Sequence, residues 1–310
     1  MTTKTLFVRA LTALDASAWS NTRGLYGISQ HLDIELDGEV GHDGMLFDFG
    51  NVKPWAKTLI DQDADHTLIV PTLAEGISVT DCLEGLSLRF TQPYAMEVRG
   101  PRQAFCLLPV AEITDEVMTQ HFETLLMRRL PPRVDAIRVT LRNEVIEGAS
   151  YTYSHGLRHH TGNCQRIAHG HRSPLVIERN GERDAMLERE WAEKLHDRYL
   201  AEEADLVDRP GRDMVFSYEA PQGKFRIRLP RQQVWLLPTP TTIEWIADWL
   251  ARQIALASGD AIRVEAYEGI NKGAIARHTA ESARQPLILP TTVMTDAVAP
   301  SEDKANSESS

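Results

Sequence analysis

The sequence predicts an α+β protein made of two unequal copies of one unit, each an antiparallel sheet with helices on one face. The first observation is that Asp-Ala-Ile-Arg-Val occurs at 135–139 and again at 260–264, with Gly-Ala following at the same distance both times. The second is that further matches precede this motif in the same order. They pair 27–39 with 170–182, Trp55-Ala56 and Leu59 with Trp191-Ala192 and Leu195, and 107–109 with 236–238.

These matches give the order of elements within each unit. Two strands come first, and the Trp-Ala pair then marks a helix. Extra strands follow, and the amphipathic stretches at 114–128 and 242–257 predict a second helix before the final strand. The second unit is shorter between its second strand and first helix, because it lacks a counterpart of Gly-Met-Leu-Phe-Asp-Phe at 44–49.

The length supports this division, since 310 residues correspond to two domains of roughly 150 residues. We expect a first copy at 1–148 and a second copy at 149–280. The remainder, 281–310, is rich in Pro, Ser, Thr and Glu without periodicity, which predicts a disordered tail.

Composition excludes several classes of function. With 33 Lys and Arg against 44 Asp and Glu, the net charge is −11, so we expect no nucleic-acid-binding face. No apolar run could span a bilayer, and the N-terminus has no secretory core, which predicts a cytoplasmic protein without membrane contact. The three cysteines, Cys82, Cys106 and Cys164, are too few for a disulfide scaffold.

Histidines are densest at the start of the second copy. His169 and His171 alternate along a strand and therefore share a face, with Gly170 between them. His155 on a neighbouring strand would complete three ligands for zinc with a fourth position open. The alternative is chance, since the chain has 11 histidines, including an isolated pair at 159–160.

Cys164 precedes His169 by five residues, so a cation there could lower its pKa and make it a base or nucleophile. Cys82 and Cys106 have no histidine nearby in sequence and are interpreted as structural thiols. Two acidic positions add to the candidates. Asp65 can orient His66 for proton transfer, and Glu268, at the position of Asn143 in the first copy, can accept two hydrogen bonds from a ring edge. Both could equally be solvated surface groups.

These motifs, in this order, resemble the 6-pyruvoyl-tetrahydropterin synthase and 6-carboxy-tetrahydropterin synthase family, whose members adopt the tunnelling fold (T-fold). The resemblance covers about 5–276 and implies tandem T-fold domains, but the motifs are divided between the copies. The second copy has the histidines, Cys164, Thr-Thr-Ile-Glu at 241–244 and Glu268, and the first has 44–49 and Asp65-His66. In the first copy we expect Thr12, Tyr26 and Ile28 where the family has zinc ligands, Asn21 where it has the cysteine and Asn143 where it has the final glutamate. In the second copy we expect the residues near 204–206 where the family has Asp-His.

The resemblance implies a role for each residue. His155, His169 and His171 would hold Zn²⁺, Cys164 would remove a proton, and His66, oriented by Asp65, would relay protons. Glu268 would anchor the pterin ring, with Thr241, Thr242 and Glu244 around it. The implied substrate is 7,8-dihydroneopterin triphosphate. The cationic candidates for its phosphates are Arg158, His159, His160, Arg166 and Lys272.

The resemblance therefore implies a zinc-dependent pterin lyase with one active site composed from both copies, serving queuosine or tetrahydropterin biosynthesis. Closing the sheets into a barrel requires several chains, so we expect a homo-oligomer of three chains that forms a pseudo-hexamer. Two alternatives stay open: a zinc- and pterin-binding homologue without turnover, and a T-fold enzyme acting on another pterin or purine. Whether the site is shared within one chain or between chains is also open.

Overall fold

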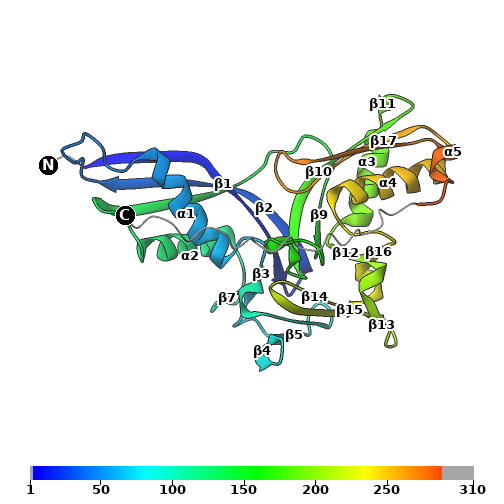
Figure 1. Ribbon diagram of the computed structural model, residues 1–310, viewed down its shortest axis with the longest axis horizontal. Coiled ribbons are helices and arrows are strands. Elements are labelled where there is room, and N and C mark those ends of the chain that lie inside the picture. The colour runs from blue at the N-terminus through cyan, green and yellow to red at the C-terminus, as the bar shows by residue number, and fades with distance from the viewer. Residues whose placement is uncertain (1–2, 288–310) are drawn as a thin grey trace, which may run out of the picture.

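The computed structural model describes residues 3–287 and shows two sheets, each with helices on one face, and a third sheet below them (Figure 1). The first copy contains β1 (Lys4–Ser20), β2 (Gly24–Gly38), α1 (Phe49–Asp63), β3 (Leu68–Pro71), β4 (Ile77–Cys82), β5 (Gly85–Phe90), β6 (Met96–Gly100), β7 (Phe105–Leu108), α2 (Asp115–Met127) and β8 (Val134–Asn143).

The second copy repeats this order. It contains β9 (Ser150–His155), β10 (His169–Arg179), β11 (Glu182–Arg183), α3 (Ala185–Leu195), β12 (Arg198–Glu202), β13 (Leu206–Asp208), β14 (Asp213–Ala220), β15 (Gly223–Pro230), β16 (Val234–Leu237), α4 (Ile243–Ser258), β17 (Ile262–Tyr267), β18 (Gly273–His278) and α5 (Ala280–Ala283). The first part of the tail predicted at 281–310 is attached to α4, because Arg252 donates hydrogen bonds to the backbone carbonyls of Ala283 and Gln285. The rest of that tail, 288–310, lies outside the described residues.

Both copies have the same strand order: β7-β3-β1-β2-β8 in the first sheet and β16-β12-β9-β10-β17 in the second, which β18 extends. The prediction of antiparallel sheets holds for the central strands, but β3 pairs in parallel with both β1 and β7, and β12 pairs in parallel with both β9 and β16. The helix after β2 carries the chain back across the sheet, so β3 runs parallel to β1, and the strands β4–β6 return the chain in the same way before β7. Among residues 3–287, no helix is long and apolar enough to cross a membrane.

Local sequence signals explain the helix boundaries. Asp48 and Asp184 begin α1 and α3, and each side chain accepts a hydrogen bond from a backbone N–H of the first turn. Thr114 begins α2 in the same way, and Gly259 ends α4 with a left-handed backbone, φ 80°. The helices predicted at 114–128 and 242–257 are thus present nearly as expected.

Strand register identifies the equivalent residues of the two copies. Ser17 pairs with Gly27 as Ser154 pairs with Gly170, so Ala18, and not the expected Thr12, occupies the position of His155. Thr12 lies farther from the β1–β2 turn, because the long β1 strand offers several alternating registers that sequence matching cannot distinguish. Tyr26 and Ile28 do occupy the positions of His169 and His171.

The counterpart of Asp65-His66 also differs from the prediction near 204–206. His66 donates its backbone N–H to Asp15, and Asp197 donates to Thr152, which is the position of Asp15 in the second copy. Both donors have a left-handed backbone, with φ 54° and φ 55°. The counterpart is therefore His196-Asp197, the same two residue types in reversed order, which a search for Asp-His does not find.

The third sheet joins the copies. Its order is β13-β14-β15-β6-β5-β4, with β15 antiparallel to β6, so the extra strands of both copies form one sheet around a local pseudo-twofold axis. A buried apolar cluster that includes Trp19, Phe90, Phe216 and Phe225 lies between this sheet and the other two. Each of the other sheets has its own core against its helices.

The central hairpins of the two copies also touch each other directly. The hydroxyls of Ser17 and Ser154 lie 2.6 Å apart across the interface. A Cβ on Gly27 would lie 2.2 Å from the carbonyl oxygen of His171, and a Cβ on Gly170 would lie 2.6 Å from the Ser17 hydroxyl. Glycine at both positions permits this close backbone approach, which places the end of β1 beside the histidine strand.

Candidate active site

Three imidazoles meet at the loop end of the β9–β10 hairpin. His155 is directly opposite His169 in the strand register, and His171 is on the same face of β10. All three side chains are fully buried, with the rings of His155 and His169 centred 4.3 Å apart. One ligand nitrogen from each ring lies within 4.8 Å of the other two. The predicted strand geometry therefore brings together the three predicted metal ligands.

Backbone carbonyls orient two of these rings. His155 Nδ1 lies 2.9 Å from the carbonyl oxygen of Thr241, and His169 Nδ1 lies 2.9 Å from that of Arg166. An Nδ1–H that donates to a carbonyl leaves the Nε2 lone pair for a metal. The Nε2 atoms of all three histidines are buried and have no hydrogen-bond partner among residues 3–287.

Electrostatics keep two of these rings, those of His155 and His169, neutral. Burial lowers the pKa of His155 and His169 well below the usual range, and neighbouring imidazoles lower it further. Neutral imidazoles with unpartnered Nε2 atoms are the ligands that zinc requires. The residues present fit a zinc ion.

Asp15 of the first copy supports His171, and sequence reasoning missed it. Its carboxylate lies 3.3 Å from His171 Nδ1 and also accepts hydrogen bonds from Ser29 and Lys272, at 2.5 and 3.2 Å. Burial favours the neutral acid, but His171, Lys272 and Ser29 outweigh it and hold the pKa of Asp15 well below its usual range. The contact joins residues of different copies, so no local motif marks it.

We expect Asp15→Asn to weaken zinc binding roughly 10- to 100-fold, as loss of a ligand-supporting carboxylate typically does. A competition titration against a chelator measures this. Asp33→Asn is the matched control, because Asp33 is also buried in this sheet and ion-paired with Arg142 but lies away from the histidines. Equal zinc affinity in Asp15→Asn and wild-type protein would contradict a supporting role.

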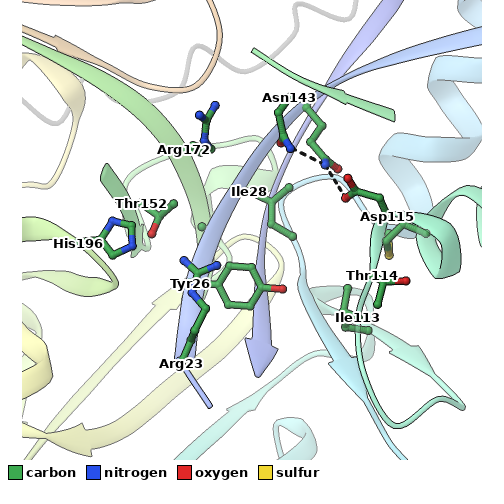
Figure 2. Close-up of a pocket in the computed structure, with 13 residues that line it drawn as sticks. Arg23, Tyr26, Ile28, Ile113, Thr114, Asp115, Asn143, Thr152, Arg172 and His196 are labelled. Atoms are coloured by element: carbon green, nitrogen blue, oxygen red, sulfur yellow. Dashed lines mark hydrogen bonds between the residues drawn. The ribbon is translucent and has the colours of Figure 1, made fainter. Parts of the chain in front are cut away.

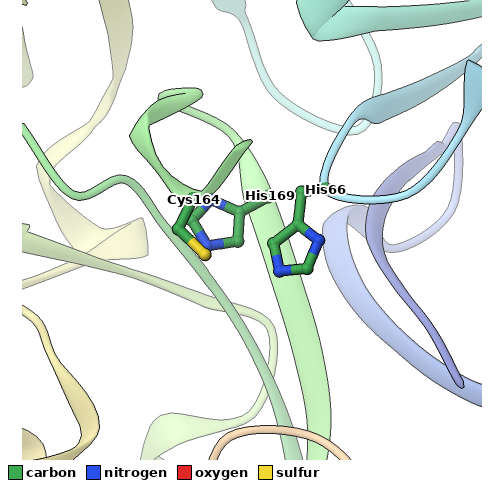
Figure 3. Close-up of side chains that lie close together, drawn as sticks. All are labelled: His66, Cys164 and His169. Atoms are coloured by element: carbon green, nitrogen blue, oxygen red, sulfur yellow. The ribbon is translucent and has the colours of Figure 1, made fainter. Parts of the chain in front are cut away.

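A thiol and a fourth imidazole lie beside the three histidines (Figure 3). Cys164 is in a short 3-10 turn between β9 and β10, and its Sγ lies within 4.8 Å of ligand nitrogens of His66 and His169. His66 comes from the first copy, after α1, and its ring is 5.2 Å from that of His169. Cys164 and His66, which belong to different copies, therefore meet within a single chain.

Hydrogen bonds fix the His66 ring. Its Nδ1 lies 2.6 Å from Asp65 Oδ2, which leaves Nε2 for the thiol. Burial opposes a charge on the ring, but the hydrogen bonds with Asp65 and Cys164 raise the pKa of His66 to about 10. Asp65 is fixed in turn, since its Oδ1 accepts the N–H of Asp15 at 3.0 Å and its carbonyl accepts from Arg166 at 3.1 Å.

The predicted ring-binding residues lie at the ends of neighbouring elements. Thr241 is buried and uses its carbonyl to orient His155. Thr242 begins α4, and Glu244 is exposed in its first turn. Glu268 lies in the β17–β18 turn, next to Gly269, which packs against the Asp15 carboxylate. Their role in binding a pterin stays a prediction.

The cationic candidates for a triphosphate are mostly bound to acids of the chain itself. Arg158 pairs with Asp205 at 2.8 Å, and Lys272 pairs with Asp15. Arg166 is buried under Asp65. These three cations therefore stabilise the site's own structure.

The equivalent place in the first copy is a cavity of about 420 Å³ without the ligand set (Figure 2). Tyr26 and Ile28 line it where the second copy has histidines, and Asn143 lines it at the Glu268 position. His196 and Thr152 reach it from the second copy. The pseudo-twofold thus relates one metal-competent site to one without imidazole ligands at the corresponding strand positions.

Comparison with known proteins agrees with this asymmetry. A family model described as 6-pyruvoyl tetrahydropterin synthase matches residues 144–279. The second copy belongs to this family. The first copy repeats its strand order, so the chain has tandem T-fold architecture.

Solved structures of 6-pyruvoyl tetrahydropterin synthase also align with part of the chain. The enzyme from Plasmodium vivax is 16% identical, over 46% of this chain and 91% of that chain, with a TM-score of 0.38. The enzyme from Plasmodium falciparum is 15% identical, over 45% and 90%, with a TM-score of 0.38. No curated protein matches the chain.

Proposed function

We propose that this chain is a zinc-dependent pterin lyase that acts on 7,8-dihydroneopterin triphosphate and yields a 6-carboxy- or 6-pyruvoyl-tetrahydropterin. The observation that supports this best is the set of three buried Nε2 atoms that have no hydrogen-bond partner in the described part of the chain, next to a thiol and an Asp-oriented imidazole. The family of the second copy supplies the pterin chemistry.

Each residue has a defined task in this proposal. Bound zinc would act as a Lewis acid toward the substrate side chain. Cys164, as its thiolate, accepts the proton that leaves the side-chain carbon. His66 returns a proton from Nε2, because its hydrogen bonds with Asp65 and Cys164 keep the ring protonated at neutral pH. Glu268, with Thr241, Thr242 and Glu244, anchors the ring.

The proposal includes a cytoplasmic homo-oligomer of three chains in queuosine or tetrahydropterin biosynthesis. The two outer strands of the first sheet, β7 and β8, each pair on only one side within residues 3–287, which supports lateral association between chains. Light scattering coupled to size exclusion tests the number of chains.

Incubation of the zinc-loaded chain with dihydroneopterin triphosphate tests the reaction. We expect stoichiometric release of inorganic triphosphate and a six-substituted pterin, which mass spectrometry identifies as the carboxy or pyruvoyl product. Zinc-loaded protein that binds the pterin without releasing triphosphate would instead be a binding homologue. A different product would indicate an enzyme for another pterin or purine.

A further inference from the structure

A second cluster of metal-ligating side chains lies in the first copy. Asp63 ends α1, Cys106 is in β7 and His121 is in α2. Their Oδ2, Sγ and Nε2 atoms lie within 4.8 Å of one another. We propose that these three residues bind a second zinc ion, separate from the one held by the histidines of the second copy.

The three ligand atoms lie close to one another, as the ligands of one metal ion do. Cys106 Sγ is 3.7 Å from Asp63 Oδ2 and 3.9 Å from His121 Nε2, and Asp63 Oδ2 also contacts that nitrogen. A Cys-His-Asp proton relay would instead place the thiol and the carboxylate on opposite ring nitrogens. Zinc bonds of about 2.0–2.3 Å at tetrahedral angles separate adjacent ligand atoms by roughly 3.3–3.8 Å. The two sulfur distances are close to this range, so an ion needs mainly a small separation of Asp63 from His121.

Burial also suits a partly open metal site. Cys106 is 4% exposed, whereas the side chains of His121 and Asp63 are 24% and 29% exposed. The thiol is therefore the buried ligand, and the other two ligands lie toward solvent, where water can occupy the fourth coordination position of the metal. A thiolate, an imidazole and a carboxylate together favour zinc over harder cations such as magnesium.

The second copy has an apolar contact at the same place. Strand register puts Trp235 at the position of Cys106, and Trp249 lies as far from the N-cap of α4 as His121 lies from the N-cap of α2. The two indoles pack with centroids 5.3 Å apart. Helix α1 also runs past the end of the equivalent α3, and this additional turn supplies Asp63. The first copy thus has the ligand set where the second copy has an aromatic pair.

Metal analysis of the full-length protein tests the proposal. We expect two zinc ions per chain in the wild type and one in Cys106→Ser. In Co²⁺-substituted protein, a thiolate charge-transfer band should persist in Cys164→Ala and disappear when Cys106→Ser is added. Asp63→Asn should weaken Co²⁺ binding at this site by about tenfold or more, at least the loss seen when a group that supports a metal ligand is removed. Asp61→Asn is the matched control, because Asp61 lies two residues earlier in α1 and pairs with Lys57.

Two results would overturn it. One is a single zinc per chain in wild-type protein that retains its catalytic metal. The other is a cobalt spectrum and a metal content that Cys106→Ser and Asp63→Asn both leave unchanged. Because Asp63 is partly exposed at a helix end, Asp63→Asn tests the site even if Cys106→Ser destabilises the core. Neither result depends on whether the chain turns over a pterin.

Discussion

Cys164→Ala is expected to lower kcat for triphosphate release by roughly 10²- to 10⁴-fold, the usual loss when an acid–base group is removed. Zinc content should not change, because the three histidine Nε2 atoms remain in place. Single-turnover kinetics together with metal analysis measures both quantities. Cys82→Ala is the matched control, since Cys82 is a thiol in β4 with no place in the site.

His66→Asn extends the same test. Asparagine tolerates the left-handed backbone of His66 better than alanine does, so the variant removes the proton carrier with little strain. We expect a comparable loss of kcat with unchanged zinc content. Full activity in both variants would contradict the proposed roles of the thiol and the imidazole.

Gly27→Ala is expected to have the largest effect on the structure. The new Cβ would lie 2.2 Å from the carbonyl oxygen of His171 and 2.5 Å from both its amide nitrogen and the carbonyl oxygen of Tyr153. Backbone atoms of a paired hairpin cannot move aside individually, so the two copies must separate locally. We expect the free energy of unfolding to fall by about 3 kcal/mol or more, at the upper end of the cost of overpacking. The zinc ligands on β10 should be displaced as well.

Calorimetry and zinc analysis measure this outcome. Gly50→Ala is the control, because its Cβ would contact only the Asp48 side chain, at 3.2 Å, and alanine favours the helix. A Gly27→Ala protein with wild-type melting temperature and zinc content would show that the hairpins do not pack in this way in solution.

Local sequence patterns predicted a large part of this molecule. The spacing of His169 and His171 fixes a shared strand face, and the repeated motifs fix the order of elements, because both depend on backbone periodicity. Asp15 escaped prediction because its partner His171 belongs to the other copy. The same holds for the cluster of Asp63, Cys106 and His121, which three separate elements bring together. Pairing of β6 with β15 depends on the contact between copies and has no sequence motif of its own.

That pairing changes what the composite site requires in order to exist. A site divided between separate chains forms only as far as those chains associate, and dilution removes it. Here β6 and β15 belong to one polypeptide, so the Asp65-His66 half meets the Cys164 half at a fixed effective concentration. Each residue of the composite site then needs to be present in only one of the two copies. Under the proposed function, the first copy does not need metal ligands of its own, and neither copy alone would hold the complete set of site residues.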